Sequence, residues 1–131
     1  MKTGSKSDIV NYRLARANET LNEIEFLIQQ GYLNNAVNRL YYASFYAVVA
    51  LLTQYDINTK THNGTRQMFG LHFIQPGIIS KASGSFYRDI FDKRQTGDYE
   101  DFIVFEEDEV KSFLLPARNL LKEIEQIIAN K

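Results

Sequence analysis

One stretch of the chain, residues 33–52, would be apolar on nearly every side if it formed a helix. From Leu40 onward its only polar groups are Ser44 and the tyrosine hydroxyls. A helix with this character is buried in a protein core or in a membrane. Arg39 and three asparagines occupy its first two turns. We therefore predict that it is the central helix of a soluble helical bundle and not a membrane span.

The segment before this helix has the apolar spacing of a second long helix. It starts after a residue suited to helix capping, either Ser7 or Asp8. It ends before Gly31, and glycine favours the left-handed conformation found after helix C-termini. The very short connection predicts that the two helices form an antiparallel hairpin. The apolar stripe of the first helix alternates spacings of four and three residues: Val10, Leu14, Ala17, Leu21, Ile24 and Ile28.

The middle of the chain predicts two shorter helices separated by polar turns. The first covers about residues 65–74 and stops at residues 75–77, because Pro76 cannot continue the hydrogen-bond ladder. The second covers residues 78–91, with a later start favoured by the serines and glycine at 83–85, and a polar loop follows it at 92–101. The expected buried residues are Met68, Phe69, Leu71 and Phe73 in the first helix, and Ile79, Ala82, Phe86 and Ile90 in the second.

The C-terminal part predicts an extended linker and a last helix. Residues 102–105 are apolar, and we expect them to place their phenylalanines under the bundle, with a short strand as the alternative. The acidic residues 106–109 open the last helix at the positive end of its dipole, and Pro116 should bend that helix. The predicted fold is an all-α, up-and-down bundle of four to five helices. It forms a single domain over residues 1–131, with residues 1–7 disordered.

Charge and composition narrow the possible classes of function. The net charge is −1, from 15 basic and 16 acidic residues, and 44% of the residues are hydrophobic. These values exclude a disordered tail and an overall basic nucleic-acid binder. Cysteine is absent, and His62 and His72 are the only histidines, so we predict neither a metal site nor a cofactor. The N-terminus lacks the apolar run of a signal peptide, and we therefore expect a cytoplasmic protein.

The first candidate site lies on the central helix. Arg39, Tyr42 and Tyr46 are spaced i, i+3, i+7 and so share one line of that helix. An arginine can pair with a phosphate, and tyrosine rings can stack on bases. The alternative is an ion-paired arginine beside tyrosines whose rings belong to the core.

Two further candidate sites are predicted in loops. Residues 61–64, which include His62 and are followed by Arg66, precede a helix whose free amides could hold an anion, and the alternative is a plain helix cap. Residues 93–99 form a connector with four functional side chains, Lys93, Arg94, Asp98 and Tyr99, and loops often carry function. The alternative there is an exposed pair of Arg94 with Asp98, which contributes less than about 1 kcal/mol.

Three segments of the sequence resemble one protein family. Residues 34–46 are similar to the second helix of HEPN domains, small α-helical proteins of prokaryotes, in the branch with the pattern A-x-x-R-x-Y-Y-A-x-F. Residues 61–64 resemble the T-H-x-G segment of that branch, and residues 94–99 resemble its R-x-x-x-D-Y segment. The matches follow the order of the family and span residues 13–128.

The resemblance implies a symmetric homodimer as well as a helical bundle. Many members of the family are ribonuclease toxins paired with a nucleotidyltransferase antitoxin, and others bind nucleotides or act as interaction modules. Active members use an R-x(4–6)-H motif, and the two copies of the motif meet across the dimer cleft. The histidine moves protons near neutral pH and the arginine stabilises the charged phosphate, so that no metal is needed.

This sequence departs from the active motif. Asp98, followed by Tyr99, stands after Arg94 where active members have histidine. A carboxylate ionised at neutral pH is a poor proton donor. We therefore predict a dimeric module that binds nucleotide, RNA or a partner protein in a toxin–antitoxin or defence setting and lacks the usual catalytic histidine. The candidate residues are Arg94 and Asp98 for catalysis, and Arg39, Tyr42, Tyr46, His62 and Tyr99 for ligand binding.

Two other hypotheses remain open. One is a metal-independent endoribonuclease that uses Arg94 with an unusual proton carrier. The other is a purely structural or interaction domain whose dimer surface is its whole function.

Overall fold

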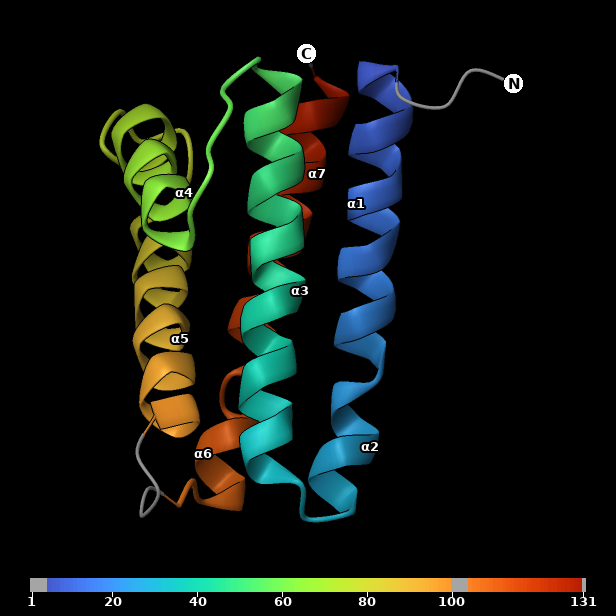
Figure 1. Cartoon of the computed structure of the whole chain (residues 1–131), viewed down its shortest axis with the longest axis vertical. Coiled ribbons are helices and arrows are strands. Elements are labelled where there is room, and N and C mark those ends of the chain that lie inside the picture. The colour runs from blue at the N-terminus through green and yellow to red at the C-terminus, as the bar shows by residue number, and fades with distance from the viewer. Residues whose placement is uncertain (1–4, 100–103, 131) are drawn as a thin grey trace.

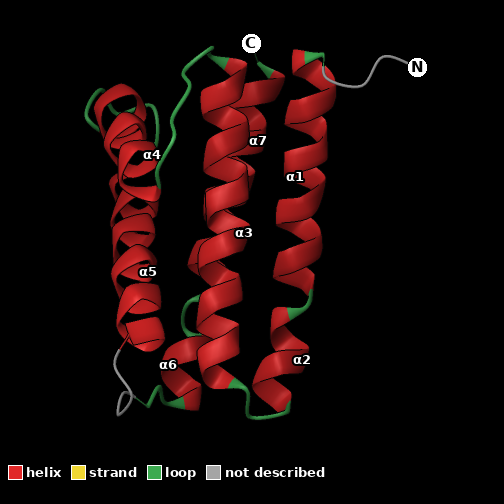
Figure 2. Cartoon of the chain, in the orientation of Figure 1, coloured by secondary structure: helices red, strands yellow, loops and turns green. Residues whose placement is uncertain are grey.

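The computed structural model describes residues 5–99 and 104–130, with the side chains of 96–99 outside the described part. All regular structure in these residues is helical (Figures 1 and 2). The helices are α1 (Lys6–Asn22), α2 (Ile24–Gln29), α3 (Leu33–Gln54), α4 (His62–Phe69), the π-helix η1 (Gly70–Ile74), α5 (Lys81–Tyr99), α6 (Glu107–Lys111) and α7 (Leu114–Ala129). Because α1 continues into α2, α4 into η1 and α6 into α7, the bundle has five helical units. The prediction of an all-α, up-and-down bundle is confirmed.

The central helix α3 lies between α1 and α5, with α7 behind it (Figure 1). It buries Leu40, Tyr41, Leu51 and Leu52 almost completely. Ser44 is also fully buried, and its hydroxyl donates to the Leu40 carbonyl at 2.9 Å, so its one polar group is satisfied within the helix. None of the described helices meets the length and hydropathy needed to cross a membrane.

The first helical unit starts earlier than expected and is interrupted. The Ser5 hydroxyl accepts from the Asp8 amide at 3.2 Å, which makes Ser5 the N-cap in place of Ser7 or Asp8. As a result, α1 begins inside the segment 1–7 that we expected to be disordered. A turn at Glu23 separates α1 from α2, although Ile24 and Ile28 stay buried as the apolar spacing predicts. Gly31 has a φ of 80°, the left-handed conformation expected after the helix end.

The α4–η1 unit differs from its prediction at both ends. It begins at His62, because the Thr61 hydroxyl accepts from the Gly64 amide at 2.8 Å and caps the helix there. After Phe69 the chain widens into a π-turn, closed by a bond from the Gln75 amide to the Gly70 carbonyl at 2.9 Å. The wider turn shifts which side chains face the core. The expectation that Leu71 is buried is therefore wrong, since 52% of it is exposed.

The prediction of a loop at residues 92–101 is wrong for residues 92–99, because α5 continues without a break from Lys81 to Tyr99. This segment holds no proline. Phe91, just before it, packs into the core, and Arg94 in its first turn lies against α3. Tertiary packing therefore outweighs the polar composition of the segment. The later start favoured by the serines is confirmed, but Ala82 is exposed and Ser83 is buried in its place.

The C-terminal segment forms two helices where one bent helix was expected. Pro116 has no amide to bond the Ser112 carbonyl, and it lies in the first turn of α7, where proline is tolerated. The α6 helix closes before it, with the Phe113 amide bonded to the Val110 carbonyl at 3.1 Å. Phe105 is buried as expected, while Phe102 lies outside the described residues.

The start of α5 is held by a carboxylate of α7. Glu123 accepts from the Ser80 amide and the Ser80 hydroxyl, each at 2.9 Å, and also from the Ser83 hydroxyl. The Ser80 hydroxyl in turn accepts from the Ser83 amide at 3.1 Å, as an N-cap does. Burial acts to raise the pKa of Glu123, but the hydrogen bonds from Ser83 and Ser80 outweigh it and hold the pKa below 4.5.

We expect Glu123→Gln to lower the free energy of unfolding by about 1–2 kcal/mol at neutral pH, because one carboxylate oxygen of the cap is lost. Since the folded-state pKa is depressed, the contribution is complete above about pH 4.5 and disappears as the pH falls through the lower folded-state value. Urea unfolding at pH 7 and pH 3 measures the difference. Glu125→Gln, on the exposed side of the same helix, is the control, and an equal loss in both variants would contradict the cap.

Candidate functional site

A pair of adjacent tyrosines on α3 holds an arginine that comes from α5. The guanidinium carbon of Arg94 lies 4.9 Å from the ring centroid of Tyr41 and 5.5 Å from that of Tyr42. An Nη2 proton of Arg94 is donated to the Tyr42 hydroxyl over 3.2 Å. Cation–π contact and hydrogen bonding together fix the plane and the position of the charge. The side chain is half-buried, so the charge stays within reach of a ligand.

A histidine from α4 reaches the same tyrosine. The Nδ1 atom of His62 lies 2.6 Å from the hydroxyl of Tyr41, and the His62 ring is 4.5 Å from the ring of Phe45. Its place follows from the Thr61 cap, which makes His62 the first residue of α4. Two functional groups from different helices thus meet on one buried phenol. We call the five residues Tyr41, Tyr42, Phe45, His62 and Arg94 the Arg94–His62 cluster.

The electrostatics of the cluster leave one formal charge at neutral pH. Burial lowers the pKa of His62 below 6.5, and the nearby positive charge of Arg94 lowers it further. Burial also raises the pKa of Tyr41 to about 12. The imidazole and the phenol are therefore both neutral beside a guanidinium that stays protonated. The Nε2 atom of His62 makes no hydrogen bond to any described residue, and it can give or take a proton according to the tautomer.

The other predicted site residues lie elsewhere or outside the described part. Arg39 pairs with Glu23 at 3.6 Å, the ion-paired alternative that the sequence left open. Tyr46 contacts Tyr42, with ring centroids 6.0 Å apart, but its other side meets Arg16 of α1 at 5.5 Å. The backbone of residues 98 and 99 belongs to α5, and the side chains of Asp98 and Tyr99 are outside the described part of the structure.

Sequence reasoning missed two members of the cluster, Tyr41 and Phe45. Both sit at core-like positions of a helix that is apolar on nearly all sides, so periodicity alone assigns them to packing. The signal that could have found them is their spacing of four residues, which puts both rings on one line of the helix. Tyr41 is only 1% exposed, and its hydroxyl would need a partner from another segment. That partner is the histidine that the sequence treated as a separate loop feature.

Comparison with known proteins identifies the family. A family model described as the HEPN domain matches residues 10–127. The chain belongs to the HEPN family. The matched range of this HEPN domain includes all five residues of the Arg94–His62 cluster.

Relatives of this HEPN domain carry two kinds of name. A "UPF0332 protein" of Thermotoga maritima is 38% identical over 123 residues, which cover 94% of this chain and 93% of the relative. "Putative toxin MJ0142" of Methanocaldococcus jannaschii is 29% identical and covers 90% of this chain and 80% of the relative. "Putative toxin MJ0605" of the same organism is 32% identical, with 82% and 85% covered.

We expect Arg94→Gln to raise the pKa of His62 toward 6.5, because the substitution removes a neighbouring positive charge while the burial of the ring remains. The Cε1 proton of His62, followed by NMR from pH 4 to pH 8, reports the titration. Arg118→Gln removes an arginine of α7 that pairs with Glu25, and it should leave the His62 titration unchanged. A His62 pKa that does not move in Arg94→Gln would show that the two groups are not electrostatically coupled.

Proposed function

We propose that this HEPN domain is the RNA-binding, toxin-like component of a toxin–antitoxin pair. The observation that carries the proposal is that Arg94 and His62 both contact Tyr41. Tyr41 is buried, but the other four side chains of the cluster are partly exposed. A planar guanidinium suits phosphate oxygens, and Tyr42 and Phe45 beside it offer rings on which bases can stack. The names of the relatives support the toxin setting. The partner would be a nucleotidyltransferase antitoxin, as the resemblance of the motifs implies.

A homodimer is part of the proposal. One line of α3 stays half-buried. No helix crosses in front of α3 itself in the view of Figure 1. Aromatic side chains of this kind are enriched at protein interfaces. A second copy packed on this line would place two Arg94–His62 clusters close together, and sedimentation equilibrium of the wild-type chain should then give twice the monomer mass. The residues of the line are Asn38, Tyr42, Phe45, Tyr46 and Val49.

We expect wild-type protein to bind a fluorescein-labelled octauridylate in EDTA, and Arg94→Ala to weaken the binding about tenfold or more. Loss of one phosphate contact should also make the slope of log affinity against log salt shallower by about 0.7 for a single strand. Fluorescence anisotropy at several salt concentrations measures both quantities. Arg118→Ala is the matched control. Equal affinities for wild type and Arg94→Ala would count against the proposed site.

Metal-independent cleavage of RNA is the second candidate function, and the neutral state of His62 favours it. A neutral imidazole beside a guanidinium can remove the proton of a 2′-hydroxyl while the arginine stabilises the charge that develops on the phosphate. The 2′-oxygen then bonds to the adjacent phosphorus, the P–O5′ bond breaks, and the imidazolium returns its proton to the departing 5′-oxygen. This imidazole comes from α4 and not from the helix that carries Arg94. The missing histidine at position 98 therefore does not by itself remove a proton carrier from the site.

We expect His62→Asn to bind octauridylate like wild type but, if the domain is a nuclease, to cleave a longer RNA in EDTA at least about a hundredfold more slowly. Because the pKa of His62 is lowered, a base role predicts a wild-type rate that rises with pH through a value below 6.5 and then levels off. Gel analysis of an end-labelled RNA measures the rate. Equal cleavage by wild type and His62→Asn would exclude His62 as the base, and no cleavage by wild type would end the nuclease hypothesis and leave binding by Arg94 alone.

A further inference from the structure

A pocket lies close to the Arg94–His62 cluster, in the seam between the α4–η1 unit and α5. Its volume is about 360 Å³, within the size range of small-ligand sites. Among the described residues, the charged ones that line it are Arg66 and Arg88, one from each wall. In a chain of net charge −1, a pocket whose lining charges are all positive favours an anionic ligand.

The pocket and the cluster are connected through packed side chains. Tyr87 lines the pocket, and its ring centroid lies 6.2 Å from that of Tyr41. The guanidinium carbon of Arg66 lies 4.9 Å from the ring centroid of Phe91, and that ring is 5.6 Å from the ring of Tyr41. One layer of buried aromatic rings thus supports the cluster on one side and the pocket on the other.

Three arginines surround Phe91 of α5. Arg66 covers its ring, and Arg88 and Arg94 stand three residues before and after it, about 60° to either side of it around the helix axis. At a rise of 1.5 Å per residue, Arg88 and Arg94 are about 9 Å apart along the helix axis. Asp92 pairs with Arg66 at 3.5 Å, but both side chains are partly exposed, and such a pair is weak.

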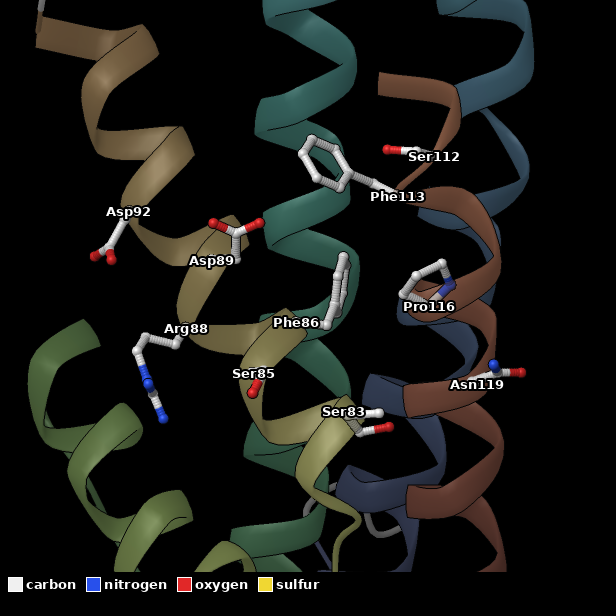
Figure 3. Close-up of a pocket in the computed structure, with 11 residues that line it drawn as sticks. Ser83, Ser85, Phe86, Arg88, Asp89, Asp92, Ser112, Phe113, Pro116 and Asn119 are labelled. Atoms are coloured by element: carbon white, nitrogen blue, oxygen red, sulfur yellow. The ribbon is translucent and has the colours of Figure 1, made fainter. Parts of the chain in front are cut away.

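Arg88 is free to meet a ligand. Among the described residues no ion pair or hydrogen bond to Arg88 occurs, and its side chain is exposed. Figure 3 shows it reaching from α5 toward the ribbon of α4, and it also lines the edge of the larger hollow of about 610 Å³ between α5 and α7, where Phe86, Phe113 and Pro116 lie.

The remaining wall of the pocket suits a nucleotide. Leu71, which is 52% exposed, and Ile74 supply apolar surface for a base, while Gln67 and Gln75 supply amide donors and acceptors for base edges. This wall includes the π-helical turn, and π-turns are frequent at functional sites. The combination of guanidinium, amide and apolar surface is that of a site for one phosphorylated nucleoside unit.

We propose that this pocket binds a nucleotide of the RNA strand whose neighbouring phosphate lies on Arg94, so that the strand passes from Arg94 over Arg66 into the pocket that Arg66 and Arg88 line. The proposal rests on the RNA-binding function proposed above. In this proposal the seam between α4 and α5 sets the path of the RNA strand, and the amides of Gln67 and Gln75 lie next to the base.

Two substitutions test the pocket independently of the cluster. Arg88→Gln removes an exposed charge that has no partner in the described structure. Gly70→Leu reduces the volume of the pocket, because Gly70 lines it and an added Cβ meets no atom within 4 Å. Circular dichroism melting should show that both variants keep the fold. Arg118→Gln, at a partly exposed arginine of α7 that pairs with Glu25, is the control for loss of charge.

We expect both variants to bind octauridylate about tenfold more weakly than wild type, with the control unchanged and the salt slope of Arg88→Gln shallower by about 0.7. Normal binding by Arg88→Gln and Gly70→Leu together with weak binding by Arg94→Ala would overturn the pocket and leave the proposed function intact. Weak binding by the two pocket variants with normal binding by Arg94→Ala would overturn the role of the cluster. No binding by wild type would overturn both.

Discussion

The whole structure depends on the burial of α3. A helix covered on nearly every side can leave polar atoms only along one narrow line, and every such atom in its interior must find a partner. The Ser44 hydroxyl finds its partner within the helix, at the Leu40 carbonyl. Tyr41 cannot, because its hydroxyl extends too far from the backbone, and it bonds to His62 of α4 instead. The requirement to satisfy one phenol therefore fixes where α4 begins to pack.

That same phenol explains how the site is assembled. The face of the Tyr41 ring attracts the Arg94 guanidinium, while its hydroxyl orients the imidazole. The ring lies between two groups that would repel each other if both were charged, and burial keeps the histidine neutral. Structure and function are hard to separate here, since the contact that orients the functional groups is also a core contact.

Much of the fold could be predicted from the sequence, because apolar spacing and capping residues are local signals. The bounds of α3 and the left-handed Gly31 are of this kind. The extension of α5 to Tyr99 could not be predicted, since residues 92–99 have a polar, loop-like composition and the contact of Arg94 with α3 is not visible in the sequence. The π-turn at Gly70–Ile74 also has no recognisable signal in the sequence. Because of it, Leu71 lies on the surface and not in the core, where we expected it. The separation of α6 from α7 depends on where Pro116 falls within a turn.

The candidate site was predictable only in pieces. Arg94, Tyr42 and His62 could each be selected by residue type. Because His62 and Arg94 are far apart in the sequence, it could not be predicted that both contact the Tyr41 ring. Arg39 drew attention because it shares a helix line with Tyr42, and its pairing with Glu23 depends on a turn between α1 and α2 that spacing did not reveal.

The cap that Glu123 places on α5 has a consequence for synthesis of the chain. Arg94 is carried by α5, and the start of α5 is held by a carboxylate that leaves the ribosome later, in α7. A nascent chain that has not yet released α7 lacks both this cap and the apolar surface against which α5 packs. Arg94 and His62 therefore take their final positions once α7 has left the ribosome and packed against α5.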